Sequence, residues 1–486
     1  MVGCDRRCPS GLPCGRRRLR CLDEQLVADA LVGDLSCPAK WRIAGGRSIH
    51  RPAGDRRGAL RVTGIIHGVI ATVRPAPKLE GAITVPGDKS ISHRALILGA
   101  IASGDSHVRG LSLGADVQST VQCLRALGVE IHDATIAGRG MQGLRAAATP
   151  LDCGNSGTTM RLLAGLLAAQ EFESDLTGDE SLSRRPMDRV VQPLLRMGAR
   201  ASWPPLRVGG QPKLEGTEYV APVPSAQVKS AILLAGLYAA GETAVVEPVK
   251  TRDHTEVMLG AMGAEVKVDG PRVAVSRTER LEPIDVAVPG DFSSAAFWLV
   301  AGGLVEAADI RLLGVGVNPT RTALADMLTS IGFRIGRARP RFEAGEAVAD
   351  LHVTPAGELR PVRVEGGMAA EMIDELPVLA VAATQIAGKS VIAGAGELRV
   401  KESNRLAAME AGLAAMGADI VTQDDGWVIT GPRRLEGARV DSAGDHRIAM
   451  ALAVAGLIAD GKTEIEGAEC VEISYPGFFD HLEYLC

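Results

Sequence analysis

One phrase recurs along this chain: the apolar end of a helix, then a glycine, then a short apolar strand. The five copies are LRALGVEI (124–131), LLRMGARA (194–201), MLGAMGAEVKV (258–268), MLTSIGFRI (327–335) and GLAAMGADIV (412–421). One supersecondary unit is therefore used at least five times. A glycine just after the last helical turn is the expected left-handed cap, so we assign these glycines a structural role only. They are Gly128, Gly198, Gly263, Gly332 and Gly417.

A second repetition divides the chain into two halves. VPGDKS at 85–90 returns as VPGDFS at 288–293, each followed by an Ala- and Leu-rich helical stretch, and the terminal FFDHLEYLC resembles a sixth helix of the repeated unit. Three units in each half predict two similar α/β lobes, with a cleft between them that the chain crosses near each VPGD. Clefts of this kind often bind small molecules. The period exceeds the roughly 20–50 residues of solenoid repeats, which disfavours a binding array.

Residues 1–70 differ from the rest in charge. They hold 13 Lys and Arg against 6 Asp and Glu, whereas residues 71–486 hold 40 against 52. The segment is rich in Arg, Gly and Pro and lacks an apolar period, so we expect it to be disordered. An organellar targeting segment is disfavoured by its six acidic residues. Two interpretations of the segment remain: a disordered basic arm, or an upstream extension that results from a start codon placed too early. We favour the extension because the first alternating strand begins at Lys78.

Composition excludes several classes of protein. An acidic body with four Trp, four Tyr and seven Phe argues against nucleic-acid binding. No apolar run reaches the roughly 18 residues that span a bilayer, so we expect no membrane partner and a cytoplasmic location. The nine cysteines form no paired C-x-x-C clips. The four in the body are scattered, as in a reduced cytosolic protein.

Polar clusters precede apolar helical stretches at many points. They are GDKSISHR (87–94), CGNSGTTMR (153–161), SRRPMDR (183–189), VPSAQVKS (223–230), TRDHTE (251–256), MIDELP (372–377), RVKESNRL (399–406) and GDHRIAMA (444–451). A helix start offers free amides and the positive end of the dipole, which favour an anion. Taken singly, GDKSISHR is explained equally well as a capped, solvated helix start, and each cluster of the second half is most often a capped, exposed helix start.

Together these clusters predict one convergent anion site. Several Lys and Arg side chains meeting in a cleft would repel one another unless phosphate or carboxylate charges lay among them. Lysine as a point charge and arginine as a fork suit both kinds of anion. A zinc site at Asp253, His254 and Glu256 lacks a second pair of ligands at helical spacing, and we reject a metal.

With these motifs in this order, residues 78–486 closely resemble the bacterial 5-enolpyruvylshikimate-3-phosphate (EPSP) synthase family. The resemblance implies an inside-out α/β fold of two lobes with six βαβαββ units. One lobe would span residues 87–289, and the other residues 71–86 plus 290–486. It also implies transfer of the enolpyruvyl group of phosphoenolpyruvate to the 5-hydroxyl of shikimate 3-phosphate by addition and elimination, with neither metal nor organic cofactor. We expect a monomer.

The resemblance also implies roles for individual residues. Shikimate 3-phosphate is expected on Ser90, Arg94, Ser225, Gln227, Arg252 and Lys401. Phosphoenolpyruvate is expected on Lys89, Gly157, Arg185, Arg405 and Arg447, and Asn155 is a further substrate-binding candidate. Asp374 and Glu402 are the expected acid/base pair, with Lys89 and His446 as helpers. The 5-hydroxyl must lose a proton while C3 of phosphoenolpyruvate gains one, and two carboxyl groups in different environments suit that exchange.

One position departs from the family pattern. Many relatives carry a lysine shortly before an aromatic-Pro pair near the C-terminus, where this chain has Ile473. A cation for phosphoenolpyruvate is therefore missing at that point.

Two rival classes remain at this stage. The related enolpyruvyl transferase that acts on UDP-N-acetylglucosamine normally has Lys-Asn at the first motif and a loop cysteine, whereas this chain has Lys89 followed by Ser90 and no cysteine in 170–210. A noncatalytic phosphate- or nucleic-acid-binding protein would use the basic segment 1–61 as its contact. The acidic body and the presence of both Asp374 and Glu402 argue against it.

Overall fold

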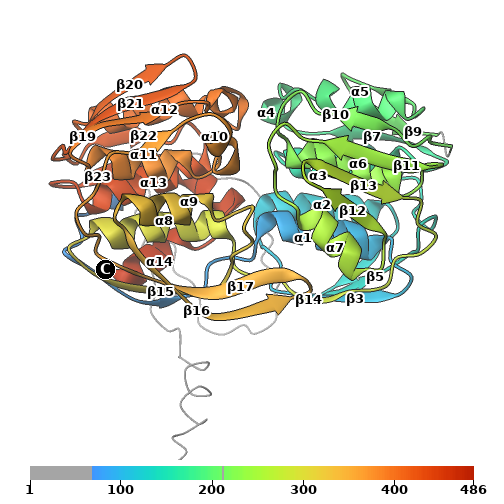
Figure 1. Cartoon of the computed structure of the whole chain (residues 1–486), viewed down its shortest axis with the longest axis horizontal. Helices are drawn as coiled ribbons and strands as arrows, with labels where there is room; N and C mark the ends of the chain where they lie inside the picture. Colours follow the sequence, from blue (N-terminus) through green and yellow to red (C-terminus); the bar gives the residue numbers. More distant parts are fainter. Residues whose placement is uncertain (1–67, 211–212) are drawn as a thin grey trace, which may run out of the picture. The chain divides into compact units, whose positions relative to one another are not determined.

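The computed structural model describes residues 68–210 and 213–486. The disorder expected in residues 1–70 therefore falls, except for its last three residues, outside the described residues, as do the five cysteines of that segment. Within the described ranges the strands form five four-stranded sheets and one three-stranded sheet (Figure 1). Each four-stranded sheet repeats one pattern, a parallel pair followed by two antiparallel neighbours. The repeated unit expected from the sequence is thus a repeated sheet.

Three of these sheets belong to the first lobe, which we define by the hydrophobic core running from Ile91 to Val288. In strand order they are β14 (Asp285–Ala287), β3 (Asp105–Arg109), β5 (Thr135–Ala137) and β4 (Glu130–His132); β6 (Leu151–Asp152), β7 (Glu173–Thr177), β9 (Leu206–Gly209) and β8 (Ala201–Ser202); and β10 (Glu218–Val220), β11 (Glu242–Val246), β13 (Arg272–Ser276) and β12 (Val266–Asp269).

The other three sheets belong to the second lobe, whose core takes residues from Val73 to Val85 and from Phe292 to Leu485. They are β2 (Lys78–Ile83), β15 (Ala307–Gly316), β17 (Glu346–Thr354) and β16 (Arg334–Glu343); β18 (Arg363–Val364), β19 (Gly388–Ile392), β21 (Gly426–Gly431) and β20 (Asp419–Gln423); and β22 (Arg439–Asp441), β23 (Thr463–Glu466) and β1 (Ile70–Val73).

Each sheet is accompanied by two main helices. The central ones are α1 (Lys89–Ala100), α3 (Gly157–Leu167), α6 (Ala226–Gly236), α8 (Phe292–Leu304), α11 (Leu376–Thr384) and α13 (His446–Leu457). Their partners are α2 (Ala115–Ala126), α5 (Asp188–Arg196), α7 (His254–Ala261), α9 (Ala323–Ile331), α12 (Arg405–Ala415) and α14 (Phe478–Leu485). Short helices are α4 (Glu180–Ser183), α10 (Gly367–Glu371), η3 (Gly396–Val400) and η4 (Ala468–Ile473). None of the helices in the described ranges is long and apolar enough to cross a membrane.

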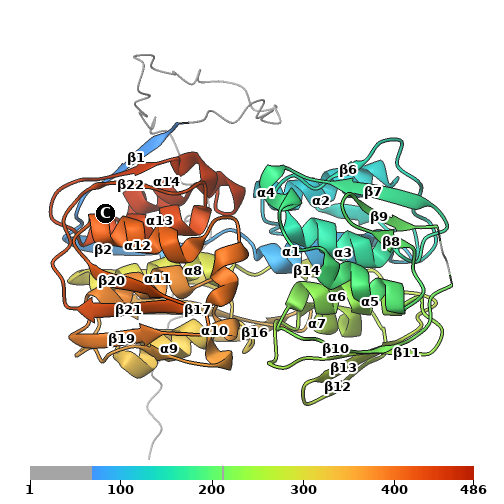
Figure 2. The same cartoon turned by 90° about the horizontal axis from the view of Figure 1, so that it is seen from above.

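The central helices form the interior of each lobe (Figure 2). Every one of the 12 residues of α13 is buried. A helix that is apolar all round must be enclosed, which explains why these stretches are runs of Ala, Leu, Ile and Gly without a polar face. Sheets outside and helices inside give the inside-out α/β fold that was expected.

The five repeated glycines have the predicted conformation. Gly128, Gly198, Gly263, Gly332 and Gly417 have φ between +85° and +116°. Each one ends a partner helix and turns the chain into the next strand. The assignment of these glycines as helix caps is confirmed.

The two VPGD segments lie side by side where the chain passes between the lobes. The Asp88 amide donates to the Pro289 carbonyl at 2.7 Å, and the Asp291 amide donates to the Pro86 carbonyl at 2.8 Å. Each aspartate also caps the central helix that follows, since its side chain accepts from the first-turn amides of α1 or α8. We call segments 85–88 and 288–291 the crossings.

One strand precedes the first strand that the alternation of apolar and polar residues predicts. β1 (Ile70–Val73) precedes the expected strand at Lys78 and pairs antiparallel with β23. Its Ala71 and Val73 side chains are buried. A strand of four residues followed by Arg74 and Pro75 is too short to display a period, which is why the sequence pattern did not indicate it.

Candidate active site

A polar cavity of about 450 Å³ is lined by residues of both lobes. All six central helices begin at or beside it. Five of them place their first or capping residue in the lining, and α11 places there the residue just before its cap; these residues are Lys89, Gly157, Ser225, Asp291, Asp374 and His446. Six helix N-termini aimed at one volume give it a positive potential before any side chain is counted.

The charged side chains add to that potential. Ten cations line the cavity: Lys89, Arg94, Arg161, Arg185, Arg189, Arg252, Arg321, Lys401, Arg405 and Arg447. Six carboxylates accompany them: Asp116, Asp291, Glu371, Asp374, Glu397 and Glu402. The excess of positive charge in an otherwise acidic body supports an anionic ligand.

All but one of the residues predicted from the sequence line this cavity. They are Lys89, Ser90, Arg94, Gly157, Arg185, Ser225, Gln227, Arg252, Asp374, Lys401, Glu402, Arg405, His446 and Arg447. Eight motifs spread over more than 350 residues therefore meet at one place.

Asn155 is the exception, because it is absent from the lining. Its Oδ1 accepts from Arg185 at 2.5 Å, and its Nδ2 donates to Asp179 at 2.6 Å. Asn155 thus lies behind Arg185 and fixes the direction of that guanidinium. A substrate-binding role for Asn155 stays a prediction.

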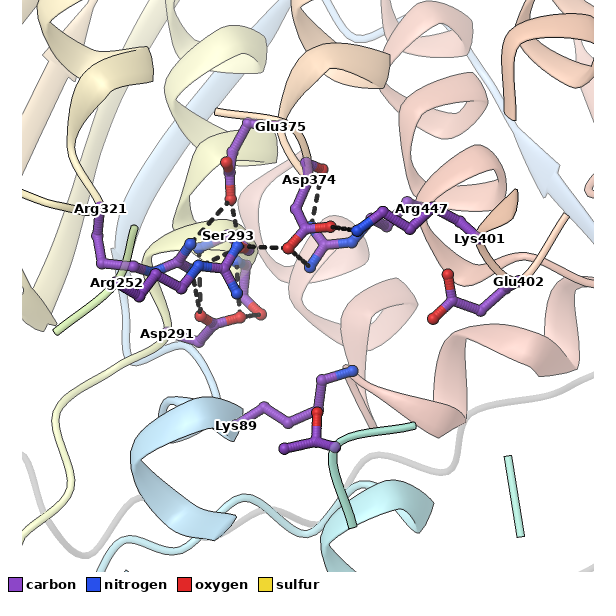
Figure 3. A network of polar contacts seen from close by, with 12 residues as sticks. Lys89, Arg252, Asp291, Ser293, Arg321, Asp374, Glu375, Lys401, Glu402 and Arg447 are labelled. Carbon is purple, nitrogen blue, oxygen red and sulfur yellow. Dashed lines mark hydrogen bonds and ion pairs between the residues drawn. The ribbon is translucent and has the colours of Figure 1, made fainter. Parts of the chain in front are cut away.

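Asp374 lies among four cations, of which Figure 3 labels Arg252, Lys401 and Arg447. Arg252 of the first lobe donates to it, Lys401 and Arg405 are each 3.5 Å away, and Arg447 is 3.8 Å away. Burial alone would raise the pKa of this carboxyl, but the charges of Lys401, Arg447 and Arg252 hold it well below its usual range. Asp374 is therefore a carboxylate at neutral pH.

Glu402 has a comparable environment on the other side of Arg405. It accepts from Arg405 at 2.5 Å, and Arg185 of the first lobe is 3.7 Å away. Burial opposes ionisation, yet Arg405, His446 and Arg185 hold the pKa of Glu402 well below its ordinary value. One guanidinium thus touches both candidate proton-transfer groups.

Lys89 and His446 complete this part of the cavity. The Lys89 ammonium lies 2.9 Å from Asp116, a carboxylate in the first turn of α2. Burial and the charge of Lys89 lower the pKa of His446 to about 4, so the imidazole is neutral at pH 7. Both of its ring nitrogens are buried, and neither has a hydrogen-bond partner in the described residues.

The first-lobe side of the cavity is held by a buried arginine. Arg94 Nε donates to Thr255 Oγ1 and Nη2 donates to Ser230 Oγ, both at 2.7 Å, while Nη1 reaches the Ser90 carbonyl at 2.9 Å. These bonds fix α1 against α6 and α7. On α6, Gln227 binds Arg161 and donates to Thr158 at 2.8 Å.

Sequence reasoning missed several lining residues. Arg161 and Arg189 end two of the motifs quoted above, so their position was a usable signal. Arg321 lies two residues before α9, and its guanidinium binds Ser293 at 2.7 Å and Asp291 at 3.3 Å (Figure 3). Asp291 belongs to the repeated VPGD, which we had noted only as a marker of architecture.

Ile473 does not replace the expected cation. It ends η4, and its side chain packs against the core of the second lobe instead of lining the cavity. The excess of cations in the cavity comes from other elements.

Comparison with known proteins gives one consistent family. The family model for EPSP synthase (3-phosphoshikimate 1-carboxyvinyltransferase) matches residues 73–482. A 3-phosphoshikimate 1-carboxyvinyltransferase from Gloeobacter violaceus is 52% identical over 428 residues, which cover 85% of this chain and 98% of that protein. The enzyme of the same name from Citrifermentans bemidjiense is 50% identical over 422 residues, with the same coverage of both chains.

Solved structures agree with the sequence relatives. The EPSP synthase from Acinetobacter baumannii superposes with a TM-score of 0.77 at 43% identity and covers 85% of this chain and 97% of its own. The enolpyruvyl transferase NikO from Streptomyces tendae superposes with a TM-score of 0.72 over 86% of this chain and 97% of its own. At 18% identity, that second likeness concerns the fold alone.

Proposed function

Since this chain belongs to the EPSP synthase family, we propose that the cavity is where it transfers the enolpyruvyl group of phosphoenolpyruvate to shikimate 3-phosphate. This reaction is a step of the shikimate pathway, which supplies the aromatic amino acids. The observation that carries the assignment of the site is the convergence of six helix starts and ten cations on one cavity. We further propose a cytoplasmic monomer with domains 87–289 and 71–86 plus 290–486.

Shikimate 3-phosphate is assigned to the first-lobe side of the cavity. Ser90, Arg94, Ser225, Gln227 and Arg252 lie there, and Lys401 approaches from the second lobe. Arg94 is held by three bonds before any ligand arrives, so little side-chain entropy remains to be lost on binding. A preorganised guanidinium of this kind suits a phosphate or a carboxylate.

Phosphoenolpyruvate is assigned to the space between the lobes. Lys89, Gly157 and Arg185 belong to the first lobe, while Arg405 and Arg447 belong to the second. A ligand that needs cations from both sides is held best when the lobes are closed around it. The same cations are placed to stabilise the phosphate as it leaves.

Asp374 and Glu402 are assigned the proton transfers. Both are ionised in the free protein, so each begins as a proton acceptor. One of them takes the 5-hydroxyl proton as that oxygen attacks C2 of phosphoenolpyruvate. The group that protonates C3 must first gain a proton itself, and anionic substrates that neutralise Arg185 and Arg405 would raise its pKa. In the elimination step the proton at C3 moves in the opposite direction.

A turnover assay tests the proposed function. Phosphate release from phosphoenolpyruvate should require shikimate 3-phosphate and should not occur with UDP-N-acetylglucosamine. Turnover with the nucleotide sugar alone would assign the chain to the other enolpyruvyl transferases. Binding of shikimate 3-phosphate without turnover would make it a noncatalytic binding protein.

A further inference from the structure

The hairpin β16–β17 extends from the second lobe onto the first. At its base it pairs with β15, which pairs with β2. At its turn Ala344 packs against the core of the first lobe, and a Cβ on Gly345 would lie 2.9 Å from Val257 of α7. The path of the hairpin between the lobes can be followed in Figure 1. We call residues 339–350 the strap.

Two bulges direct the strap toward the crossings. The register of β15 with β17 shifts between Leu312 and Val315, and that of β16 with β17 shifts between Ala338 and Arg341. Bulges bend and twist the strands that carry them. Beyond the bulges, Val315 forms a bridge with Gly290 of one crossing, which itself bridges Gly87 of the other. The strap is thus joined through backbone hydrogen bonds to both crossings.

A buried polar cluster ties the strap to the first lobe. Glu346 Oε1 lies 2.7 Å from His254 Nδ1, and Glu346 Oε2 accepts from Asn318 at 3.1 Å. Asn318 also donates to Asp253 at 2.7 Å. The side chains of His254 and Glu346 are only 1% and 3% exposed. A buried carboxylate that loses its partners costs much free energy. The contacts of Glu346 therefore specify where the strap docks on the first lobe.

The helix that receives the strap also forms part of the substrate site. α7 begins at His254, and Arg252, which donates to Asp374, lies two residues earlier. Thr255 is the next residue of the helix and accepts from Arg94 at 2.7 Å. A shift at His254 would therefore displace Arg252 and also the Thr255 hydroxyl that helps to orient Arg94.

We propose that Glu346 is a positioning residue for the shikimate 3-phosphate site. By holding His254, it fixes the start of α7 relative to the second lobe and so sets where Arg252 and Arg94 meet the substrate. Neither Glu346 nor His254 lines the cavity, so the effect is exerted through α7. The identity of the substrate rests on the proposed function, whereas the coupling between strap and helix does not.

Variants at one hairpin pair test this role. Glu346→Ala should raise the KM for shikimate 3-phosphate about tenfold, with kcat and the KM for phosphoenolpyruvate within about twofold of wild type. Glu346→Gln should recover most of the affinity, because its amide oxygen still accepts from His254. The matched control is Glu343→Gln: Glu343 is the cross-strand neighbour of Glu346, but its side chain pairs with Arg341 of its own strand. This control should leave all three constants unchanged.

A direct binding measurement separates positioning from stability. Calorimetry with shikimate 3-phosphate alone should show the same tenfold loss in Glu346→Ala. If Glu346→Ala does not fold, Glu346→Asp, which shortens the side chain by one methylene, should give a smaller loss of about threefold. Wild-type affinity in a folded Glu346→Ala or Glu346→Asp variant, even with a lower melting temperature, would overturn the proposal. Absence of turnover in the wild type would instead refute the proposed function.

Discussion

Arg405 donates a hydrogen bond to Glu402 at 2.5 Å from a guanidinium that is itself buried. The same side chain binds Asp445 through Nε at 2.7 Å, so it cannot swing away without leaving a buried carboxylate unpaired. Glu402 is therefore ionised in the free protein. Under the proposed mechanism it can act as an acid only after the bound substrates change the charge around Arg405.

Asp374 and Glu402 should be separable by their effects on turnover. Asp374→Asn and Glu402→Gln keep the size of each side chain and remove its titrating group. We expect kcat to fall by roughly 10²–10⁴ with substrate affinity largely kept. Steady-state kinetics measure the loss, and solvent-deuterium incorporation at C3 identifies the half-reaction affected. Near-normal kcat in both variants would disprove the assignment.

Arg185 should act mainly on phosphoenolpyruvate. Its guanidinium lines the cavity and is oriented by Asn155 at 2.5 Å. Arg185→Ala should raise the KM for phosphoenolpyruvate by about 10²-fold, and Asn155→Ala by a smaller factor, because the cation is kept but no longer held. The KM for shikimate 3-phosphate serves as the internal control. Equal increases in both constants would place Arg185 in a general structural role.

The sequence predicted those parts of the structure that depend on local chemistry. Gly128 and its four counterparts adopt positive φ because a helix end requires it, wherever the helix lies. The site motifs were visible for a similar reason, since each is a run of polar residues at the start of an apolar helix. That these motifs meet in one cavity was predicted from the repeated halves of the chain and from the family resemblance.

The features that were missed depend on partners distant in sequence. Arg321 is a single arginine in its own segment of the sequence. Its place in the site becomes visible only from its contacts with Ser293 and Glu375. Asn155 stays a predicted substrate-binding residue, and nothing local in the sequence shows that its amide binds Arg185 and Asp179. The strap was not predicted from the sequence, because its outer strand, β16, is largely exposed and shows no alternation of buried and exposed positions.

The positive charge of the cavity should keep the lobes apart until an anion binds. Arg252 with Asp374 and Arg185 with Glu402 join the lobes across the cavity, but the ten cations outnumber the six carboxylates, so the net repulsion opposes full closure. Shikimate 3-phosphate should therefore reduce the radius of gyration measured by X-ray scattering, whereas shikimate, which lacks the phosphate, should have a smaller effect. An unchanged radius at saturating shikimate 3-phosphate, with binding confirmed independently, would contradict this prediction.

Two buried histidines should make the fold sensitive to acid. Burial lowers the pKa of His93 to about 3 and that of His446 to about 4, from an ordinary value of 6.5. Between pH 6.5 and 4 these two histidines bind protons in the unfolded chain but not in the native protein. The free energy of unfolding therefore falls as the pH falls, by up to about 1.4 kcal/mol per pH unit for each histidine. Carboxylates with lowered pKa values lose their contribution only below about pH 4.

Thermal unfolding between pH 7 and pH 4.5 checks this assignment. The double variant His93→Asn/His446→Asn should show a flatter dependence of melting temperature on pH than the wild type, whatever its stability at pH 7. An equal slope in both proteins would assign the acid sensitivity to other groups.

Lys229 should be essential for the stability of the first lobe. Its side chain is 1% exposed, and its ammonium lies 2.8 Å from Glu247 and 2.7 Å from Glu256. One cation thus serves two buried carboxylates. Burial raises the pKa of Glu256 even though the charge of Lys229 opposes the shift.

Lys229→Met shortens the side chain by one heavy atom and removes its charge. Two buried carboxylates would then lack a cation, so we expect the free energy of unfolding to fall by roughly 3–5 kcal/mol. The triple variant Lys229→Met/Glu247→Gln/Glu256→Gln should regain much of that loss, because uncharged amides are far cheaper to bury than carboxylates. Urea denaturation followed by circular dichroism measures both variants. A loss below about 1 kcal/mol in Lys229→Met, or a triple variant less stable than the single one, would show that the ion pairs are not what stabilises this part of the lobe.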